Sequence, residues 1–229
     1  MWQPPVNVTE NPALHNRGPV FTDRLDAGTQ LAKLLSDRQD SDAIICAIPA
    51  GGVPVGIAVA RELALTFDVL VVSKMTLPWN TEAGFGAMAT DGTSLLNLEL
   101  VDATGLDNDE ITRATDATRA KVARREKHYR EIIRKQDLAN RAVILVDDGL
   151  ASGFTLRVAI ESAKNQNAKH IAVAVPTGHS ASVESVATEC DWLFCANVRE
   201  GLRFAVADAY RQWTDVSEDE VVQLLEQVR

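Results

Sequence analysis

Short apolar runs alternate with helical patterns along most of this chain, which predicts an α/β fold. The apolar runs lie at 43–48, 69–72, 142–146, 170–175 and 192–195. Runs with so few polar positions are typical of strands buried on both faces, as in a parallel sheet covered by helices. Because helical patterns follow most of these runs, we expect strand–helix–strand units with right-handed crossovers.

Helical spacing and capping residues predict the remaining elements. An apolar stripe with Thr22 or Asp23 as N-cap predicts a first helix, and Asp107 caps a long helix over 108–135. A capping box over 217–220 opens the last helix. Further helices are expected after Pro54 and at 154–166 and 180–189.

Two segments depart from this alternation. Residues 1–20 hold four prolines and little periodicity, so we expect an extended arm. Residues 77–105 do not follow the alternation of strands and helices. Their pattern predicts two short strands around a turn at Asp91-Gly92.

Composition narrows the classes of function. The net charge of −9 disfavours a general nucleic-acid binder, which would usually be basic. No apolar run reaches the roughly 18 residues that a membrane span needs. The start of the chain lacks the pattern of a signal peptide, and three cysteines without a Cys-x-x-Cys pair fit a reduced, cytoplasmic compartment. We expect Cys46 to be a buried thiol; Cys190 and Cys195 could ligate a metal only with partners that the sequence does not identify.

The stretch from Val143 to Thr155 carries the strongest chemical signal. Four apolar residues run directly into Asp147 and Asp148. The carboxyl ends of parallel strands are where ligands bind in open α/β sheets. Carboxylates at that edge can accept hydrogen bonds from sugar hydroxyls or hold a hydrated cation.

A loop of small and hydroxyl-bearing residues follows the two acids. Gly149 and Gly153 permit a tight turn and a close approach to a ligand, and Ser152 and Thr155 supply hydroxyls. The helix expected from Phe154 presents free N–H groups and a positive dipole end, which suit a phosphate. The alternative is an ordinary strand–turn–helix junction, which would leave this combination of acids, glycines and hydroxyls unexplained.

This order of residues resembles the signature of the type I phosphoribosyltransferases, which bind 5-phosphoribosyl 1-pyrophosphate (PRPP). The signature is an apolar strand, two acids and then Gly-x-x-[Ser/Thr]-Gly-x-Thr, and every position is matched between Val143 and Thr155. The resemblance implies an α/β fold: a parallel-sheet core with flanking helices, a hairpin and long-helix insert, and a small hood from the terminal segments. It implies a single domain over 1–229, with an arm at 1–20, the insert at 77–135 and a C-terminal element at 196–229.

A second glycine-rich loop lies between the first sheet strand and its helix. Gly51 and Gly52 can turn successive N–H groups toward one anion, although a tight strand-to-helix turn would need the same glycines. The loop resembles the pyrophosphate loop of one branch of the family, which usually reads Pro-Arg-Gly-Gly-Val-Pro-Val. Ala50 replaces that arginine, and Ser73 replaces the arginine of a downstream Arg-Lys pair. The substitutions call turnover into question unless Lys74 or the basic helix supplies the missing charge.

The resemblance implies a reaction at C1 of ribose, in which a nitrogen nucleophile displaces Mg²⁺-bound pyrophosphate. Asp147 and Asp148 would be catalytic: they would hold the ribose hydroxyls and favour a positively charged transition state, or one would act as a base. Both would contact Mg²⁺ through water. The 5-phosphate would be bound by Gly149, Leu150, Ala151, Ser152, Gly153, Phe154 and Thr155. Pyrophosphate would be bound by Ala50, Gly51, Gly52 and Lys74. The family also implies a homodimer.

The helix at 108–135 is the one strongly basic element of the sequence. Residues 113–135 carry a net charge of +6 and leave the rest of the chain at −15. This helix could hold positive charge near a polyanion, with Arg124 and Arg125 at the mouth of the site. The alternative, which we favour, is a solvated face with ion pairs such as Glu126–Arg130.

The identity of the acceptor stays open. His179 could contact an acceptor or simply cap the next helix, and we favour a surface or capping role. Trp79, Phe85 and Trp192 could stack on a base or belong to the core. Two other functions remain: a non-catalytic sensor of PRPP or a nucleotide, which Ala50 and Ser73 favour, and an enzyme acting on phosphate esters through its paired aspartates.

Overall fold

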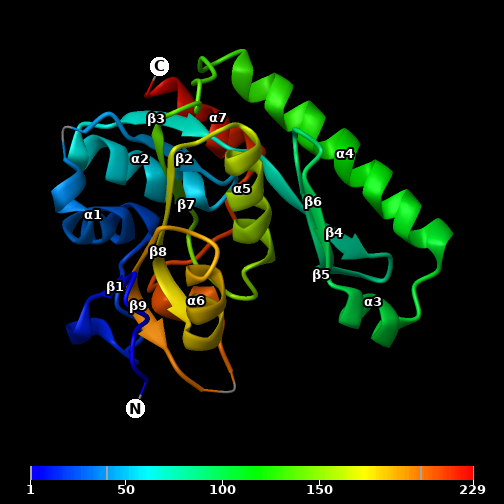
Figure 1. Ribbon diagram of the computed structural model, residues 1–229, viewed down its shortest axis with the longest axis horizontal. Helices are drawn as coiled ribbons and strands as arrows, with labels where there is room; N and C mark the ends of the chain where they lie inside the picture. The colour runs from blue at the N-terminus through cyan, green and yellow to red at the C-terminus, as the bar shows by residue number, and fades with distance from the viewer. Residues whose placement is uncertain (1, 40, 202, 229) are drawn as a thin grey trace.

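The computed structural model describes residues 2–39, 41–201 and 203–228. Its main sheet has six strands, all parallel to their neighbours (Figure 1). In spatial order these are β1 (Val8–Glu10), β9 (Trp192–Arg199), β8 (His170–His179), β7 (Ala142–Val146), β2 (Ile44–Ala47) and β3 (Thr66–Val69). The expected α/β fold with a parallel sheet and flanking helices is confirmed.

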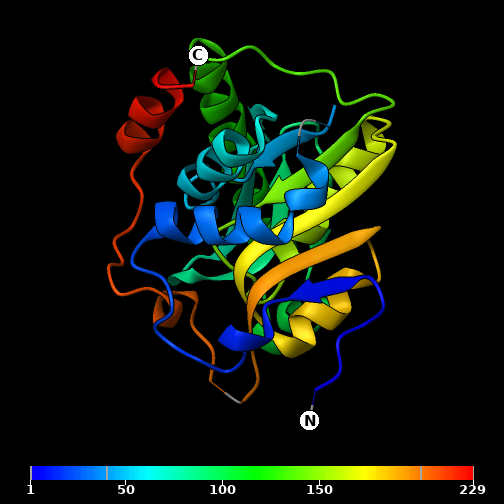
Figure 2. The same ribbon diagram turned by 90° about the vertical axis from the view of Figure 1, so that its left-hand side faces the viewer.

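Alternate residues of the buried strands face two separate cores. Ile45 and Ile144 pack under α1 (Arg24–Leu34) and α2 (Gly52–Leu63), which lie in front of the sheet in Figure 2. Leu145 and Val173 pack under α5 (Phe154–Asn165) and α6 (Ser180–Ala187) on the opposite face. Burial on both faces explains why these strands read as unbroken apolar runs.

A second, antiparallel sheet stands beside the first. It contains β4 (Val72–Leu77), β5 (Asn80–Ala89) and β6 (Ser94–Leu96), with the expected Asp91-Gly92 turn between the last two. Helices α3 (Leu98–Thr104) and α4 (Asn108–Arg130) complete this part, and Met75, Phe85 and Met88 form its apolar centre (Figure 1). The C-terminal helix α7 (Glu218–Glu226) packs against α2 and α4.

The structure differs from the sequence-based elements in several places. The strands expected at 170–175 and 192–195 run on to His179 and Arg199. The single strand expected at 69–72 is the end of β3 and the start of β4, because the chain leaves one sheet for the other at 70–71. The arm at 1–20 contains β1 and a turn of 3-10 helix at Pro12–Leu14. The long helix ends at Arg130 rather than at 135.

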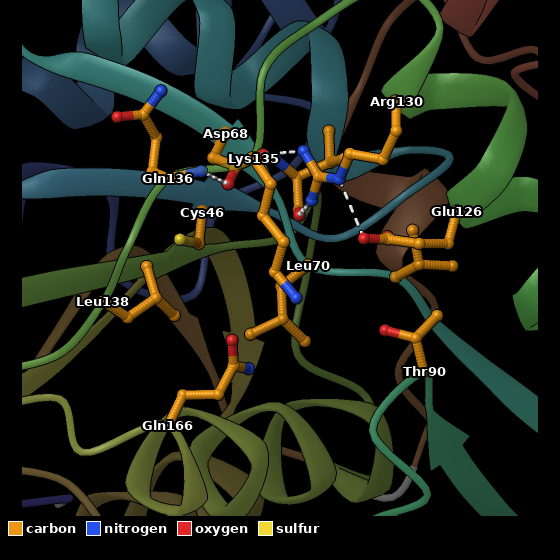
Figure 3. Close-up of a pocket in the computed structure, with 12 residues that line it drawn as sticks. Cys46, Asp68, Leu70, Thr90, Glu126, Arg130, Lys135, Gln136, Leu138 and Gln166 are labelled. Carbon is orange, nitrogen blue, oxygen red and sulfur yellow. Dashed lines mark hydrogen bonds and ion pairs between the residues drawn. The ribbon is translucent and has the colours of Figure 1, made fainter.

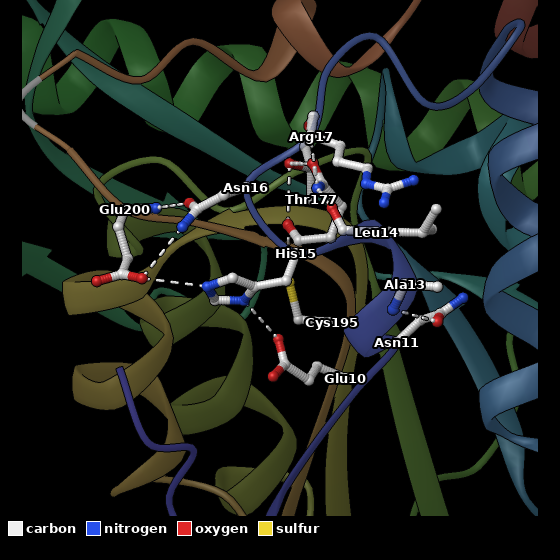
Figure 4. A network of polar contacts seen from close by, with 11 residues as sticks. Glu10, Asn11, Ala13, Leu14, His15, Asn16, Arg17, Thr177, Cys195 and Glu200 are labelled. Atoms are coloured by element: carbon white, nitrogen blue, oxygen red, sulfur yellow. Dashed lines mark hydrogen bonds and ion pairs between the residues drawn. The ribbon is translucent and has the colours of Figure 1, made fainter. Parts of the chain in front are cut away.

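Hydrogen bonds of the first twenty residues fasten that arm to the end of β9 (Figure 4). His15 Nδ1 lies 3.0 Å from Glu10 Oε2, and its Nε2 lies 3.1 Å from Glu200 Oε1. The pKa of His15 is raised above its ordinary value, mainly by the hydrogen bond to Glu10. Asn197 Nδ2 donates to the carbonyls of Leu14 and Arg17. None of the helices within the described residues combines the length and apolar character needed to cross a bilayer.

A buried ion pair joins the end of α4 to β3 (Figure 3). The Arg130 guanidinium pairs with Asp68 and also donates to Glu126 Oε1 at 2.8 Å and to the Val69 carbonyl at 2.9 Å. The backbone N–H of Gln136 donates to the second Asp68 oxygen at 2.8 Å. Burial raises the pKa of Asp68, while the charge of Arg130 acts in the opposite direction.

Arg130→Ala should lower the free energy of unfolding by about 3–5 kcal/mol, because it leaves the buried Asp68 carboxylate without its cation. Arg119→Ala is the control, since Arg119 pairs with an exposed Asp116 and should change stability by less than about 1 kcal/mol. Urea unfolding measures both. Equal midpoints for the two variants would contradict this account of the pair.

Candidate functional site

Two loops meet at the carboxyl ends of neighbouring strands. Strands β2 and β7 pair in parallel, with Ala47 opposite Val146, so the segments that follow them leave the sheet side by side. The first leads through Gly51 into α2, and the second leads through Asp147 and Asp148 into α5. The sheet therefore brings together the two segments that the sequence singled out.

Glycine is required where the two loops touch. A Cβ on Gly51 would lie 2.0 Å from Asp148 Oδ2, and a Cβ on Gly52 would lie 2.5 Å from the Val146 carbonyl oxygen. Both distances are far below the contact distance between a carbon and an oxygen. The adjacent glycines thus allow the backbone of one loop to lie directly against the carboxylate of the other.

The loop after the two acids is fixed by β8 and α6. Leu150 N–H donates to the Thr177 carbonyl at 2.8 Å, and His179 N–H donates to the Leu150 carbonyl at 3.0 Å. Ser182 Oγ donates to the Ala151 carbonyl. Gly153 has φ +82° at the N-cap of α5, where the first N–H groups of the helix have no intrahelical partner. These contacts fix the loop, and the first N–H groups of α5 remain without helical partners.

A cavity of about 130 Å³ lies over this loop. It is lined by Lys74, Asp147, Asp148, Gly149, Leu150, Ala151, Ser152, Gly153, Thr155, Leu156 and Val206. Most of the residues expected to bind a 5-phosphate therefore share one cavity with both acids and Lys74. Ala50, Gly51 and Gly52 are absent from that lining; half-buried Ala50 packs against the apolar cluster of α2 and α7.

Two residues from distant parts of the chain, Arg24 and Tyr210, bond to Asp148, and two more hold Arg24 in place. Arg24 Nε donates to Asp148 Oδ2 at 2.8 Å, and Arg24 Nη1 donates to the Thr214 carbonyl at 2.8 Å. The Arg24 guanidinium lies 3.9 Å from the centre of the Trp213 ring, and Tyr210 Oη donates to the Asp148 carbonyl at 2.6 Å. Sequence reasoning assigned no such contacts. A cation in the first turn of α1, where the dipole disfavours it, is the signal that could have suggested a buried partner.

The two acids have different surroundings. Burial raises the pKa of Asp147 well above its usual range, and the negative charge of Asp148 raises this pKa further. The positive charges of Lys74 and Arg24 lower it. Asp147 Oδ1 accepts a hydrogen bond from the backbone N–H of Asp148 at 2.9 Å. Asp148 has a guanidinium partner and Asp147 does not, among the described residues.

Several other candidate residues lie outside the lining of this cavity. Arg124 and Arg125 both pair with Glu218 of α7, at 3.7 and 2.7 Å, so these two residues support the ion-pair interpretation of the helix. His179 Nε2 lies 2.8 Å from the Gly201 carbonyl. Phe85 is a core residue, whereas Trp79 is exposed.

The three cysteines are free thiols. Cys46 and Cys195 are buried, and burial raises the pKa of Cys190 to about 12. In the described part of the chain, no group of three or more His, Cys, Asp or Glu side chains could hold a metal ion by itself.

Gly51→Ala should destabilise the fold by about 1–3 kcal/mol, because the added methyl group overlaps the Asp148 carboxylate. The cost should be smaller in an Asp148→Ala background, where that carboxylate is missing. Denaturant unfolding of the four proteins of this double-mutant cycle measures the difference. The same cost in both backgrounds would mean that the two residues are not in close contact.

Comparisons with known proteins agree with this geometry. A family model described as "Phosphoribosyl transferase domain" matches residues 22–208. Proteins of two Mycobacterium tuberculosis strains, named "Putative phosphoribosyl transferase MT0597" and "Putative phosphoribosyl transferase Rv0571c", are each 36% identical over 207 residues, or 90% of this chain. The chain spans 46% of the length of these relatives. The crystal structure of TT1426 from Thermus thermophilus is 28% identical with a TM-score of 0.72, and the match covers 90% of this chain and 98% of that one.

Proposed function

Because the chain belongs to the phosphoribosyl transferase family, we propose that it transfers the 5-phosphoribosyl group of PRPP to a nitrogen acceptor with release of pyrophosphate. The observation that carries the proposal is the single cavity in which two adjacent carboxylates meet a phosphate-type loop at the start of α5. In the reaction, the nitrogen lone pair forms a bond to C1 of the ribose. The bond from C1 to the pyrophosphate oxygen breaks, pyrophosphate takes the electron pair, and the acceptor nitrogen loses its proton to a base.

The phosphate loop binds one end of PRPP. The free N–H groups at the start of α5 and the hydroxyls of Ser152 and Thr155 bind the 5-phosphate, helped by the positive end of the helix dipole. Residues 149–155 thereby fix the sugar relative to the sheet. Because β8 and α6 hold this loop, the binding groups are already in place before the ligand arrives.

The two acids bind the sugar itself. Asp148, oriented by Arg24 and by the packing of Gly51, accepts hydrogen bonds from the ribose hydroxyls. Asp147, whose raised pKa favours proton uptake, is the better candidate for the base. The negative charge of the pair favours the positive charge that develops on the ring as pyrophosphate leaves.

The same residues suit a hydrated magnesium ion rather than a fully protein-bound one. Two neighbouring carboxylates provide too few ligands for a closed site, and Mg²⁺ usually keeps several waters beside substrate phosphates. When bound with PRPP, the ion would neutralise charge on pyrophosphate and improve it as a leaving group. Lys74, which lines the cavity, would add positive charge on the pyrophosphate side. The N–H of Gly51 is the expected second donor to pyrophosphate, because the N–H of Gly52 already donates to the Ile48 carbonyl at 3.0 Å.

A non-catalytic sensor that binds PRPP or a nucleotide in the same cavity is the second candidate. It is favoured by Ala50, which packs against apolar side chains, and by the buried Ser73, since neither supplies a cation for pyrophosphate. The two functions differ in one observable: only the transferase releases pyrophosphate from PRPP.

The double variant Asp147→Asn with Asp148→Asn should lower transfer at least about a hundredfold, because it removes both negative charges from the transition state. Pyrophosphate release is measured with PRPP, Mg²⁺ and a panel of ammonia, nucleobases and heterocyclic acids. The control is Asp102→Asn with Asp116→Asn, which changes the net charge equally at exposed positions. Unchanged release by the double variant would refute the catalytic role, and wild-type PRPP binding without release would favour the sensor.

A further inference from the structure

The two oxygens of the Asp148 carboxylate have different surroundings. Oδ2 accepts a hydrogen bond from Arg24 Nε at 2.8 Å and lies against the backbone of Gly51, where a Cβ would come within 2.0 Å of it. Oδ1 has no hydrogen-bond partner among the described residues. Because Asp148 lines the cavity over the phosphate-type loop, Oδ1 is the oxygen that remains for a sugar hydroxyl.

Arg24 is itself held in one orientation by the C-terminal part of the chain. Its Nη1 donates to the Thr214 carbonyl at 2.8 Å, and its guanidinium carbon lies 3.9 Å from the centre of the Trp213 ring. The side chain is buried. These contacts use two nitrogens and the flat face of the guanidinium, a combination that a lysine ammonium cannot provide.

The backbone joins the same two parts of the chain. The N–H groups of Arg211 and Gln212 donate to the carbonyls of Phe21 and Thr22, both at 2.9 Å. Phe21 and Thr22 stand just before Arg24, which is the first residue of α1. The position of the Arg24 guanidinium is therefore set by backbone pairing as well as by its own contacts.

Arg24 acts on the cavity from outside it. The residue is not part of the cavity lining, so its route to a bound sugar runs through Oδ2 of Asp148. A carboxylate that is bonded at one oxygen and packed against a glycine backbone cannot turn freely about its last bond. Fixing the binding groups in advance in this way favours a single geometry of the bound ligand.

We propose that Arg24 is a positioning residue for the transfer: it binds Oδ2 of Asp148 and thereby aims Oδ1 at one hydroxyl of the ribose. The inference rests on the proposed transferase function and adds a residue that does not touch the substrate. Asp148 binds the sugar through one oxygen, and the second ribose hydroxyl is left to Asp147. Through this contact the paired segments 21–24 and 210–214 become part of the sugar-binding site.

The test separates binding of the sugar from binding of the phosphate. Ribose 5-phosphate and inorganic phosphate are titrated into the wild-type protein and its variants, because only the first ligand presents hydroxyls to Asp148. We expect Arg24→Gln to weaken ribose 5-phosphate binding at least about tenfold, through loss of a charge-assisted hydrogen bond, and to leave phosphate binding unchanged. Arg24→Lys should recover part of the loss, since an ammonium can still reach Oδ2. Asp148→Asn should cause a similar loss, and the double variant should add little to it.

Arg38→Gln is the matched control. Arg38 also pairs with an aspartate, Asp37 at 3.3 Å, and its guanidinium lies 4.4 Å from the centre of the Trp192 ring, but it does not line the cavity. This variant should leave both titrations unchanged. Trp213→Leu is the milder variant of the same contact, for use if Arg24→Gln does not fold, and should weaken ribose 5-phosphate binding about threefold.

Two results would overturn the proposal. Equal losses for both ligands would mean that Arg24 only supports the fold, and unchanged ribose 5-phosphate binding would mean that it does not position Asp148. In the second case the wild-type protein still binds ribose 5-phosphate, so the transferase assignment stands. If the wild-type protein binds neither ligand, the transferase assignment fails and the proposal fails with it.

Discussion

The contact between Gly51 and Asp148 is the constraint on which the site depends. The glycine backbone lies against one side of the carboxylate, and the Arg24 guanidinium bonds to the same oxygen, Oδ2. Any side chain at position 51 would displace an acid that the proposed chemistry needs in one place. Because β2 and β7 are neighbours in the sheet, this packing also fixes the spacing of the two loops that follow them.

Segments distant in the sequence supply the other groups that hold Asp148 in place. Arg24 begins α1, while Tyr210, Trp213 and Thr214 belong to the chain before α7, and all of them reach Asp148 or its partner. The buried pair of Asp68 and Arg130 anchors the C-terminal end of α4 to β3. The termini and the insert thus surround one edge of the parallel sheet.

Local patterns predicted the elements well where burial is symmetric. The runs at 43–48 and 142–146 appear as β2 and β7, because a strand covered on both faces has no polar alternation to obscure it. The change of sheet at 70–71 was missed, since an apolar run does not record which neighbour each half pairs with. The phosphate-type loop was recognisable because its residues are consecutive. The contacts of Arg24 with Trp213 and Asp148 were not, because they are tertiary and span almost the whole chain.

Binding of PRPP tests the central claim most directly. Titration calorimetry would compare PRPP, ribose 5-phosphate and pyrophosphate, each with and without Mg²⁺. The account predicts that PRPP binds more tightly with Mg²⁺, and that ribose 5-phosphate binds through the loop of residues 149–155 whether or not the metal is present. Failure of all three ligands to bind would contradict it, because the cavity of the two aspartates would then not be a phosphoribosyl site.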